Sequence, residues 1–268
     1  MRIGNFNLSI VSLKFKPVDK DYRFYGSYYR GMLGRNLKKR FCVLRDMECK
    51  DCPLNDKCLY MLSFEKYKDI LFPPYIINRS SKDSLRITLI GSFTQFSEIY
   101  IDAFKGLDLQ EAGFYNPFSN KIETKKLILN SEHFLTFNNF SNEIMVEVKF
   151  IRLKKNSKML PCKDFTFETL LKAIEKRIYL TNKYYGTPNL KVYLPKVDVE
   201  YIKEDCRYEK IYRYSNRQKR KMLIPSMSAK FLITKGVNEL FPYLNLASFL
   251  NIGTNASMGF GSVHIIER

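Results

Sequence analysis

Four cysteines between residues 42 and 58 have the spacing that most clearly suggests chemistry. They follow the pattern Cys42-x6-Cys49-x2-Cys52-x5-Cys58. Four thiolates in so short a segment match the ligand number of a structural zinc site or a [4Fe–4S] cluster. We expect structural zinc, because no redox step is needed, with the iron–sulfur cluster as the alternative. Cys162 and Cys206 lie far apart in the sequence and are expected to be buried thiols.

A glycine-rich segment near the C-terminus is the second feature with chemical potential. Gly253, Gly259 and Gly261 lie within nine residues, between a predicted helix and a predicted strand. Glycine permits positive φ and close approach of another backbone, and the N–H groups of such a loop can bind phosphate oxygens. A plain tight connection would carry the same glycines, so the loop alone does not decide between the two interpretations.

A run of basic residues precedes this loop. If one strand spans Tyr208 to Met222, alternate side chains share a face. That face would carry Arg213, Ser215, Arg217, Lys219 and Lys221. Arginine binds phosphate or the Hoogsteen edge of guanine, and Gln218 could read a base edge. We therefore expect this segment to contact RNA.

The charge of the whole chain points to a polyanionic partner. Its 268 residues include 45 Lys and Arg against 27 Asp and Glu, a formal net charge of +18. Such an excess costs self-repulsion, and nucleic acid or an anionic membrane surface are the usual reasons to keep it. We find no apolar run of roughly 18 residues that could span a bilayer and no signal-peptide pattern at the N-terminus. We expect a cytoplasmic protein with reduced thiols and no membrane partner.

Hydrophobic periodicity predicts an α+β protein in which one pattern occurs twice. Strands are predicted at 6–15, 85–90, 124–129, 144–153, 208–222, 229–234 and 263–266. Helices are predicted at 22–41, 96–104, 165–185 and 237–250. This order fits two ferredoxin-like (RRM-like) β-α-β-β-α-β units in tandem. We assign residues 1–143 to the first domain, with the cysteine-rich insertion at 42–58, and 144–268 to the second, with the glycine-rich loop.

Several short segments together resemble the CRISPR-associated RAMP endoribonucleases that cut precursor CRISPR RNA. The matching segments are Gly26 to Gly34, Pro73 to Ile77, Leu89 to Gly91, Phe165 to Leu170, Tyr185-Gly186, Arg213 to Lys221, Leu244 to Leu250, and Gly253 to Gly261. They cover nearly the whole chain. The resemblance implies two ferredoxin-like domains and CRISPR repeat RNA as substrate, with subunits of a CRISPR effector complex as further partners. It also implies metal-independent attack by the 2′-hydroxyl, leaving a 5′-hydroxyl and a 2′,3′-cyclic phosphate.

The chain departs from the commoner pattern of that family at the catalytic residue. Many members use a histidine in or near the first helix, but this chain has only His133 and His264, and neither lies there. The first helix instead offers Tyr28, Arg30 and Lys38. Cations can stabilise a charged pentavalent phosphate without a histidine. We predict that cleavage takes place beside these three side chains, with His133 as the rival.

Two other functions remain open from the sequence. The first is an inactive RAMP subunit that holds CRISPR RNA within an effector complex. The second is a zinc-stabilised DNA-binding regulator, which the lack of a helix-turn-helix or zinc-finger pattern disfavours.

Overall fold

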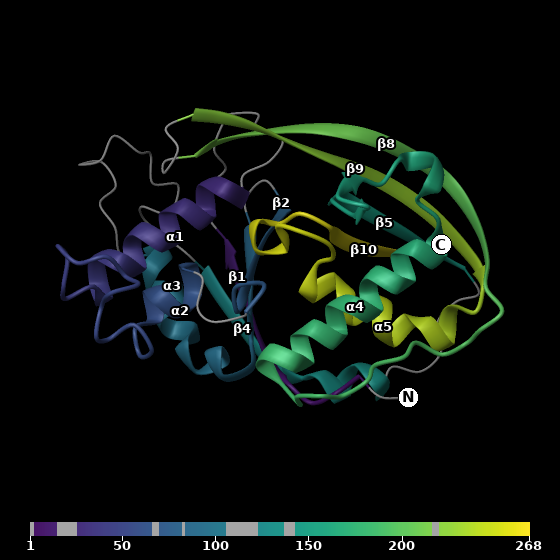
Figure 1. Ribbon diagram of the computed structural model, residues 1–268. Coiled ribbons are helices and arrows are strands. Elements are labelled where there is room, and N and C mark those ends of the chain that lie inside the picture. The colour runs from purple at the N-terminus through teal and green to yellow at the C-terminus, as the bar shows by residue number, and fades with distance from the viewer. Residues whose placement is uncertain are drawn as a thin grey trace.

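The computed structural model describes residues 3–14, 26–65, 70–81, 84–105, 123–136, 143–215 and 220–268. The strands in these ranges form two four-stranded sheets and a two-stranded ribbon, and helices pack against the sheets (Figure 1). None of the helices in these ranges has both the length and the apolar character of a membrane span.

The N-terminal half folds as one β-α-β-β-α-β unit. Its elements are β1 (Asn7–Lys14), α1 (Gly26–Phe41), α2 (Leu59–Phe64), β2 (Tyr75–Ser81), β3 (Ser84–Ile90), the 3₁₀ turn η1 (Gly91–Phe96), α3 (Ser97–Lys105), β4 (Glu123–Asn130) and the 3₁₀ turn η3 (Ser131–Thr136). The sheet order is β2-β3-β1-β4, and neighbouring strands are antiparallel. Leu33 and Leu37 of α1 pack with Ile87 of β3 and Tyr100 of α3 in a buried cluster.

The C-terminal half repeats this arrangement with longer elements. It contains β5 (Ile144–Ile151), β6 (Lys154–Lys155), β7 (Lys158–Met159), η4 (Cys162–Asp164), α4 (Phe167–Tyr185), β8 (Glu200–Ser215), β9 (Arg220–Lys235), α5 (Val237–Leu250), η5 (Ala256–Met258) and β10 (Ser262–Glu267). Its sheet order, β10-β5-β9-β8, is that of the first sheet. The Thr166 side chain accepts a hydrogen bond from the Thr169 backbone N–H (3.3 Å) and so caps α4. The predicted tandem of ferredoxin-like units is confirmed.

The basic segment forms a hairpin, so the prediction of a single strand at 208–222 was wrong. Residue Ser215 pairs with Arg220, and Arg213 pairs with Met222. Directly paired residues lie on the same face of a sheet, and the next pair lies on the other. Lys221 therefore lies opposite to Arg213, and its Nζ sits 4.7 Å from the centre of the Tyr212 ring. Arg217, Gln218 and Lys219 lie outside the described residues.

The two halves share one apolar core and a set of buried polar contacts. Phe6 and Ile90 from the first half join the same cluster as Phe231 and Leu244 from the second. Asn78 of β2 and Asn251, which follows α5, exchange two side-chain hydrogen bonds of 2.8 Å. These contacts fix the second half of the chain against β2 and the ends of β1 and β3.

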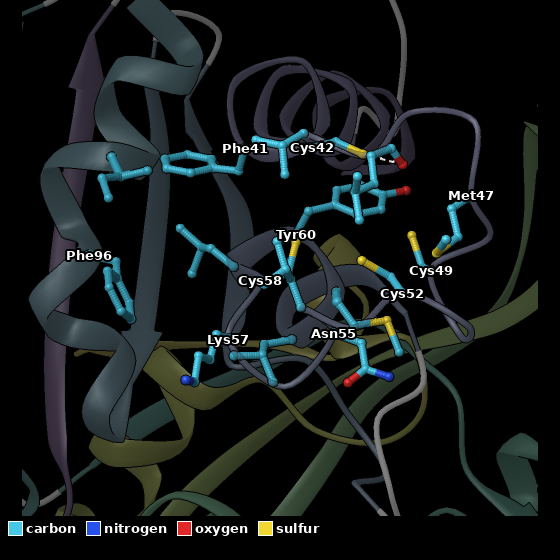
Figure 2. A pocket seen from close by; sticks show the side chains of 17 residues that line it. Phe41, Cys42, Met47, Cys49, Cys52, Asn55, Lys57, Cys58, Tyr60 and Phe96 are labelled. Atoms are coloured by element: carbon cyan, nitrogen blue, oxygen red, sulfur yellow. Dashed lines mark hydrogen bonds between the residues drawn. The ribbon is translucent and has the colours of Figure 1, made fainter.

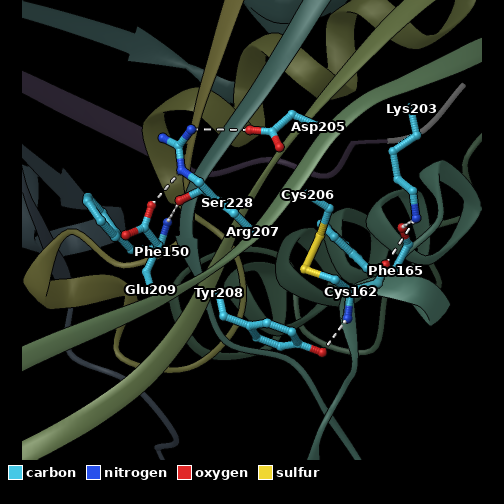
Figure 3. The surroundings of a disulfide bond; sticks show 10 residues. All are labelled: Phe150, Cys162, Phe165, Lys203, Asp205, Cys206, Arg207, Tyr208, Glu209 and Ser228. Carbon is cyan, nitrogen blue, oxygen red and sulfur yellow. Dashed lines mark hydrogen bonds and ion pairs between the residues drawn. A yellow bond between two sulfur atoms is a disulfide. The ribbon is translucent and has the colours of Figure 1, made fainter.

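Cys162 and Cys206 form a disulfide, so the expectation of two buried thiols was wrong (Figure 3). The bond joins η4 to β8. Next to it, the Tyr208 hydroxyl accepts a hydrogen bond from the Cys162 backbone N–H (3.0 Å). Lys203 Nζ donates to the Cys162 and Phe165 carbonyl oxygens (3.0 and 3.2 Å). The base of the β8–β9 hairpin is thereby fastened to the segment that leads into α4.

Candidate functional site

Arg213 of β8 is a half-buried cation whose guanidinium has poor hydrogen-bond partners. Its Nη1 contacts the sulfur of Met258 at 3.4 Å, and its Nη2 contacts the sulfur of Met222 at 4.0 Å. Thioether sulfur is a weak acceptor. Its Nε is buried and has no hydrogen-bond partner among the described residues. A buried donor without an acceptor is costly, so this side chain is suited to receive an anionic oxygen.

Two further arginines, Arg30 and Arg152, lie near enough to Arg213 for their charges to interact with its charge. The pKa of Arg213 is lowered by burial and then by the charge of Arg30 on α1. The pKa of Arg152, which follows β5, is lowered by burial and then by the charge of Arg213. Three cations from α1, β8 and the end of β5 thus converge at the junction of the two halves. We call Arg30, Arg152 and Arg213 the arginine cluster.

The arginine cluster is held by contacts that leave its charge uncompensated. Arg152 Nε donates to the Pro225 carbonyl oxygen (2.9 Å), and the guanidinium carbon of Arg30 lies 5.1 Å from the centre of the Phe64 ring. Within the described ranges, none of the three arginines forms an ion pair with a carboxylate. Like charges that repel one another without a counter-charge are stabilised by a bound anion.

The glycine-rich loop lies beside the arginine cluster. Gly253 has φ +80, and a Cβ there would come within 2.6 Å of the Arg152 carbonyl oxygen. Gly261 has φ +65, and a Cβ there would overlap the Ile252 carbonyl oxygen. The two ends of the loop are joined by a hydrogen bond from the Ile252 N–H to the Gly261 carbonyl oxygen (2.8 Å). The glycines therefore permit the packing that brings Met258 of η5 to Arg213, and Gly259 (φ +86) ends η5 in the same left-handed conformation.

The loop is also tied to the backbone that carries Arg152. The Thr254 N–H donates to the Arg152 carbonyl oxygen (3.2 Å), and the Gly261 N–H donates to that of Phe150 (3.3 Å). The Asn251 side chain donates to the Phe260 carbonyl oxygen (3.2 Å) while it pairs with Asn78. The loop, Arg152 and β2 thus form one hydrogen-bonded unit, and the predicted phosphate-binding role of the loop remains a prediction.

The structure places two of the predicted catalytic side chains of α1 in different surroundings. Arg30 belongs to the arginine cluster, whereas Lys38 lies two turns further along and is exposed. The Lys38 Nζ is 5.7 Å from the centre of the Tyr60 ring, and its charge acts on the Cys49 thiol. Lys38 therefore faces the cysteine-rich segment.

Tyr28 is half-buried on α1, with its ring 5.5 Å from that of Tyr29 in an edge contact. Burial raises the pKa of the Tyr28 hydroxyl, and the charge of Arg35 opposes that shift. A phenol with a raised pKa stays protonated at neutral pH and serves as a hydrogen-bond donor rather than a base.

The two histidines occupy other elements. The exposed His133 ring hydrogen-bonds within its own turn, to the Asn130 backbone at 3.2 Å. His264 is half-buried on β10, with its Nε2 3.3 Å from the Ser262 hydroxyl. Burial and the charges of Lys149 and Arg86 lower its pKa, against an opposing effect of Glu147.

All four cysteines of the 42–58 segment line one pocket (Figure 2). Each is a free thiol. In the part of the chain that the structure describes, no group of three or more His, Cys, Asp or Glu side chains is close enough to hold a metal ion. The metal site predicted from the spacing remains a proposal.

The sequence patterns did not identify Arg152 and Met258 as site residues. Arg152 lies near the end of a predicted strand among other cations, between Lys149 and Lys154, and Met258 lies in the loop for which only the glycines were considered. A local sign for Met258 was its place between Gly253 and Gly259. No local sign marked Arg152, because its neighbours in space come from distant parts of the chain.

Comparisons with known proteins agree with this architecture. The family model AF_1859_N, described as an N-terminal domain, matches residues 20–126. No curated protein matches the chain. Among solved structures, Thermus thermophilus Cas6 is 12% identical with a TM-score of 0.52, over 98% of this chain and 99% of that one. Csf5, a CRISPR-Cas type IV Cas6 crRNA endonuclease, is 11% identical with a TM-score of 0.51 and the same coverages.

A product complex of the same Thermus protein is also similar, at 12% identity and a TM-score of 0.51, over 97% of this chain and 99% of that one. At sequence identities this low, the similarity of the structures establishes the fold alone. The protein is therefore a tandem ferredoxin-like protein, and the three arginines at the junction of its halves form no ion pair with a carboxylate of the described residues. More particularly, it has the fold of the Cas6 crRNA endonucleases, which confirms the resemblance found in the sequence.

Proposed function

We propose that the protein binds CRISPR repeat RNA and cleaves precursor CRISPR RNA, with the scissile phosphate held by the arginine cluster. The observation that carries this proposal is Arg213, a half-buried cation that contacts thioether sulfur and whose Nε has no hydrogen-bond partner among the residues that the structure describes. A phosphate oxygen would supply the missing acceptor and would offset the repulsion among the three arginines. The likeness to Cas6 structures, one of them a product complex, supports RNA as the source of that phosphate.

The reaction that fits this site is attack by the RNA itself. The 2′-oxygen next to the scissile phosphate forms a bond to phosphorus, and its proton is lost. The bond from phosphorus to the 5′-oxygen breaks, and that oxygen takes up a proton. The products are a 2′,3′-cyclic phosphate and a 5′-hydroxyl. The arginine cluster would stabilise the extra negative charge on the pentavalent phosphate, and the protonated Tyr28 hydroxyl would serve as a hydrogen-bond donor.

Metal-independent cleavage is the finer part of this proposal. Guanidinium groups stay charged at neutral pH and can take the role that a divalent cation plays in other nucleases. The test is cleavage of labelled repeat RNA from the CRISPR arrays of the same genome, with and without EDTA, followed by analysis of the product ends. We expect the same rate with EDTA and a 2′,3′-cyclic phosphate on the upstream fragment. EDTA-dependent loss of cleavage, or 3′-hydroxyl ends, would contradict it.

A second candidate is an RNA-binding subunit of a CRISPR effector complex that does not cleave. The positions of His133 and His264 favour it, because their hydrogen bonds are to Asn130 and Ser262 and no acid–base residue of this type accompanies the arginine cluster in the described ranges. The same assay separates the two candidates. Tight, salt-dependent binding of the repeat RNA with no product at saturating protein would favour the non-cleaving subunit.

A further inference from the structure

The cysteine-rich segment has two thiols on rigid supports. Cys42 directly follows α1, and its N–H continues the helical hydrogen bonding to the Lys38 carbonyl oxygen (2.9 Å). Cys58 is the N-cap residue of α2, and its carbonyl oxygen accepts from the Leu62 N–H (3.0 Å). The positions of these two cysteines are therefore set by helices that pack into the N-terminal core.

The other two thiols, Cys49 and Cys52, lie in a segment built from turns. Most of its backbone hydrogen bonds span three residues, as from the Asp51 N–H to the Glu48 carbonyl oxygen (3.0 Å) and from the Asn55 N–H to that of Cys52 (3.1 Å). Turns of this kind can shift without breaking a sheet or a long helix. The segment thus pairs two fixed thiols with two that can adjust.

The four thiols face a common space. They line a pocket of about 320 Å³ whose remaining walls are largely apolar, including Phe41, Leu59 and Phe96. Figure 2 shows the sulfur atoms of Cys42, Cys49, Cys52 and Cys58 arranged around the ring of Tyr60.

The apolar surface of this segment is poorly buried by the protein itself. The side chain of Val43 is 73% exposed, and those of Met47 and Leu54 are exposed as well. A short segment that cannot bury its own apolar residues commonly depends on a cross-link. Cys162 and Cys206 supply one as a disulfide elsewhere in the chain, whereas the four thiols of this segment are unpaired.

We propose that Cys42, Cys49, Cys52 and Cys58 bind one structural Zn²⁺ ion, which draws the four thiols together at this pocket. Tetrahedral zinc takes four thiolates, and zinc binding is commonly coupled to the folding of its loop. Lys38, whose Nζ lies 5.7 Å from the centre of the Tyr60 ring on the wall of this pocket, places a positive charge beside the four thiols. The ion would fix the C-terminal end of α1, the helix that carries Arg30.

The first test is metal content together with cysteine variants. Protein purified without added chelator should contain about one zinc per chain. Cys49→Ser and Cys52→Ser should each lose most of it, whereas the matched control Cys162→Ser should keep it. Circular dichroism and RNA binding of the same samples show whether a variant has lost the metal or the whole fold.

The second test replaces zinc with Co²⁺, which is spectroscopically visible. Cobalt bound to four thiolates in a tetrahedral site gives intense visible bands and sulfur-to-metal charge transfer, and Zn²⁺ should displace it. These bands would report the site even if every serine variant failed to fold. A brown iron–sulfur chromophore in anaerobically purified protein, a Cys49–Cys52 disulfide, or four freely titrating thiols without metal would each overturn the proposal.

Discussion

The cations on strands β8 and β9 differ in their partners. On β8, Arg207 bonds Glu209 and Asp205 at 2.9 and 3.2 Å, and Lys235 of β9 bonds Asp198 at 2.6 Å. Six residues beyond Arg207, the Arg213 guanidinium contacts two methionine sulfurs, and its buried Nε has no partner in the described part of the chain. By strand alternation the two arginines lie on the same face. The same residue type on the same strand therefore has its charge compensated at one position and uncompensated at the other.

This difference indicates which part of the +18 net charge serves a ligand. Exposed cations that are paired with carboxylates contribute little to stability. They also contribute little free energy to the binding of a polyanion, because their carboxylates must first be displaced. The arginine cluster is partly desolvated and has no carboxylate to displace within the described ranges, so a phosphate gains the full interaction. The net charge thus indicates the class of partner, whereas the cations that lack a carboxylate partner indicate where on the protein that partner binds.

The largest expected effect comes from replacing Arg213 and Arg207 of β8 one at a time. Arg213→Gln should lower the single-turnover cleavage rate at saturating protein by about 100-fold, because a cation that stabilises the transition state is lost. Arg207→Gln should leave that rate nearly unchanged. Equal effects of the two variants would remove the distinction between paired and unpaired cations.

A smaller effect on cleavage is expected for Asn251, which positions the glycine-rich loop and is not part of the arginine cluster. Asn251→Ala removes two hydrogen bonds to the buried Asn78 amide and one to the Phe260 carbonyl oxygen, which should cost about 1–3 kcal/mol of unfolding free energy. The same variant should also slow cleavage, because the glycine-rich loop loses its tie to β2. Thermal denaturation and saturated rates measured together test this. A slower rate with unchanged stability would assign Asn251 to the RNA instead.

Within α1, the comparison separates Arg30 from Lys38. Arg30→Gln should reduce the slope of log affinity against log salt by roughly 0.7, the value for one lost phosphate contact on single-stranded RNA. Lys38→Gln should change the slope less, because Lys38 faces Tyr60 and the cysteine-rich segment. Filter-binding titrations over a range of salt measure both slopes. A larger change for Lys38 would move the RNA toward the other end of α1.

The smallest effect concerns the pH dependence of stability. The folded pKa of His264 is lowered below 6.5, so the unfolded chain takes up its proton first as the pH falls. Stability should therefore decrease as the pH falls through about 6.5 and level off below the folded pKa. His264→Gln should flatten this part of the profile and leave cleavage at neutral pH unchanged. Chemical denaturation at several pH values provides the measurement, and a profile identical to that of the parent would contradict it.

The fold was largely predictable because its signals are local. Alternation in β5 and the helical spacing of Leu170, Ile174 and Ile178 in α4 are readable from the residues themselves. The hairpin was missed because the segment at 216–219 carries no glycine or proline, so the sequence shows no turn signal that would divide the predicted strand. Strand β2 was missed because Tyr75-Ile-Ile follows two prolines as a short apolar run, for which periodicity gives no answer.

The site was only half predictable because it depends on contacts between distant segments. Arg30 and Arg213 were each singled out by their neighbours in the sequence, but their approach to one another follows from how the two units pack. Arg152 and the disulfide between Cys162 and Cys206, 44 residues apart, have no local pattern at all. Lys221 was assigned to the wrong face because it lies on the antiparallel strand β9, where it pairs with Tyr214 and Arg213 pairs with Met222.

The most direct test of the central claim is a double-change cycle between Arg213 and the scissile phosphate. Repeat RNA with a 2′-deoxy nucleotide at the cleavage position binds without reacting, and a methylphosphonate there removes the charge of that one phosphate. We measure the affinities of the parent protein and of Arg213→Gln for both RNAs. If Arg213 contacts this phosphate, each change alone weakens binding, and both together weaken it hardly further than either one. Strictly additive losses would show that Arg213 acts elsewhere on the RNA and would contradict the proposed site.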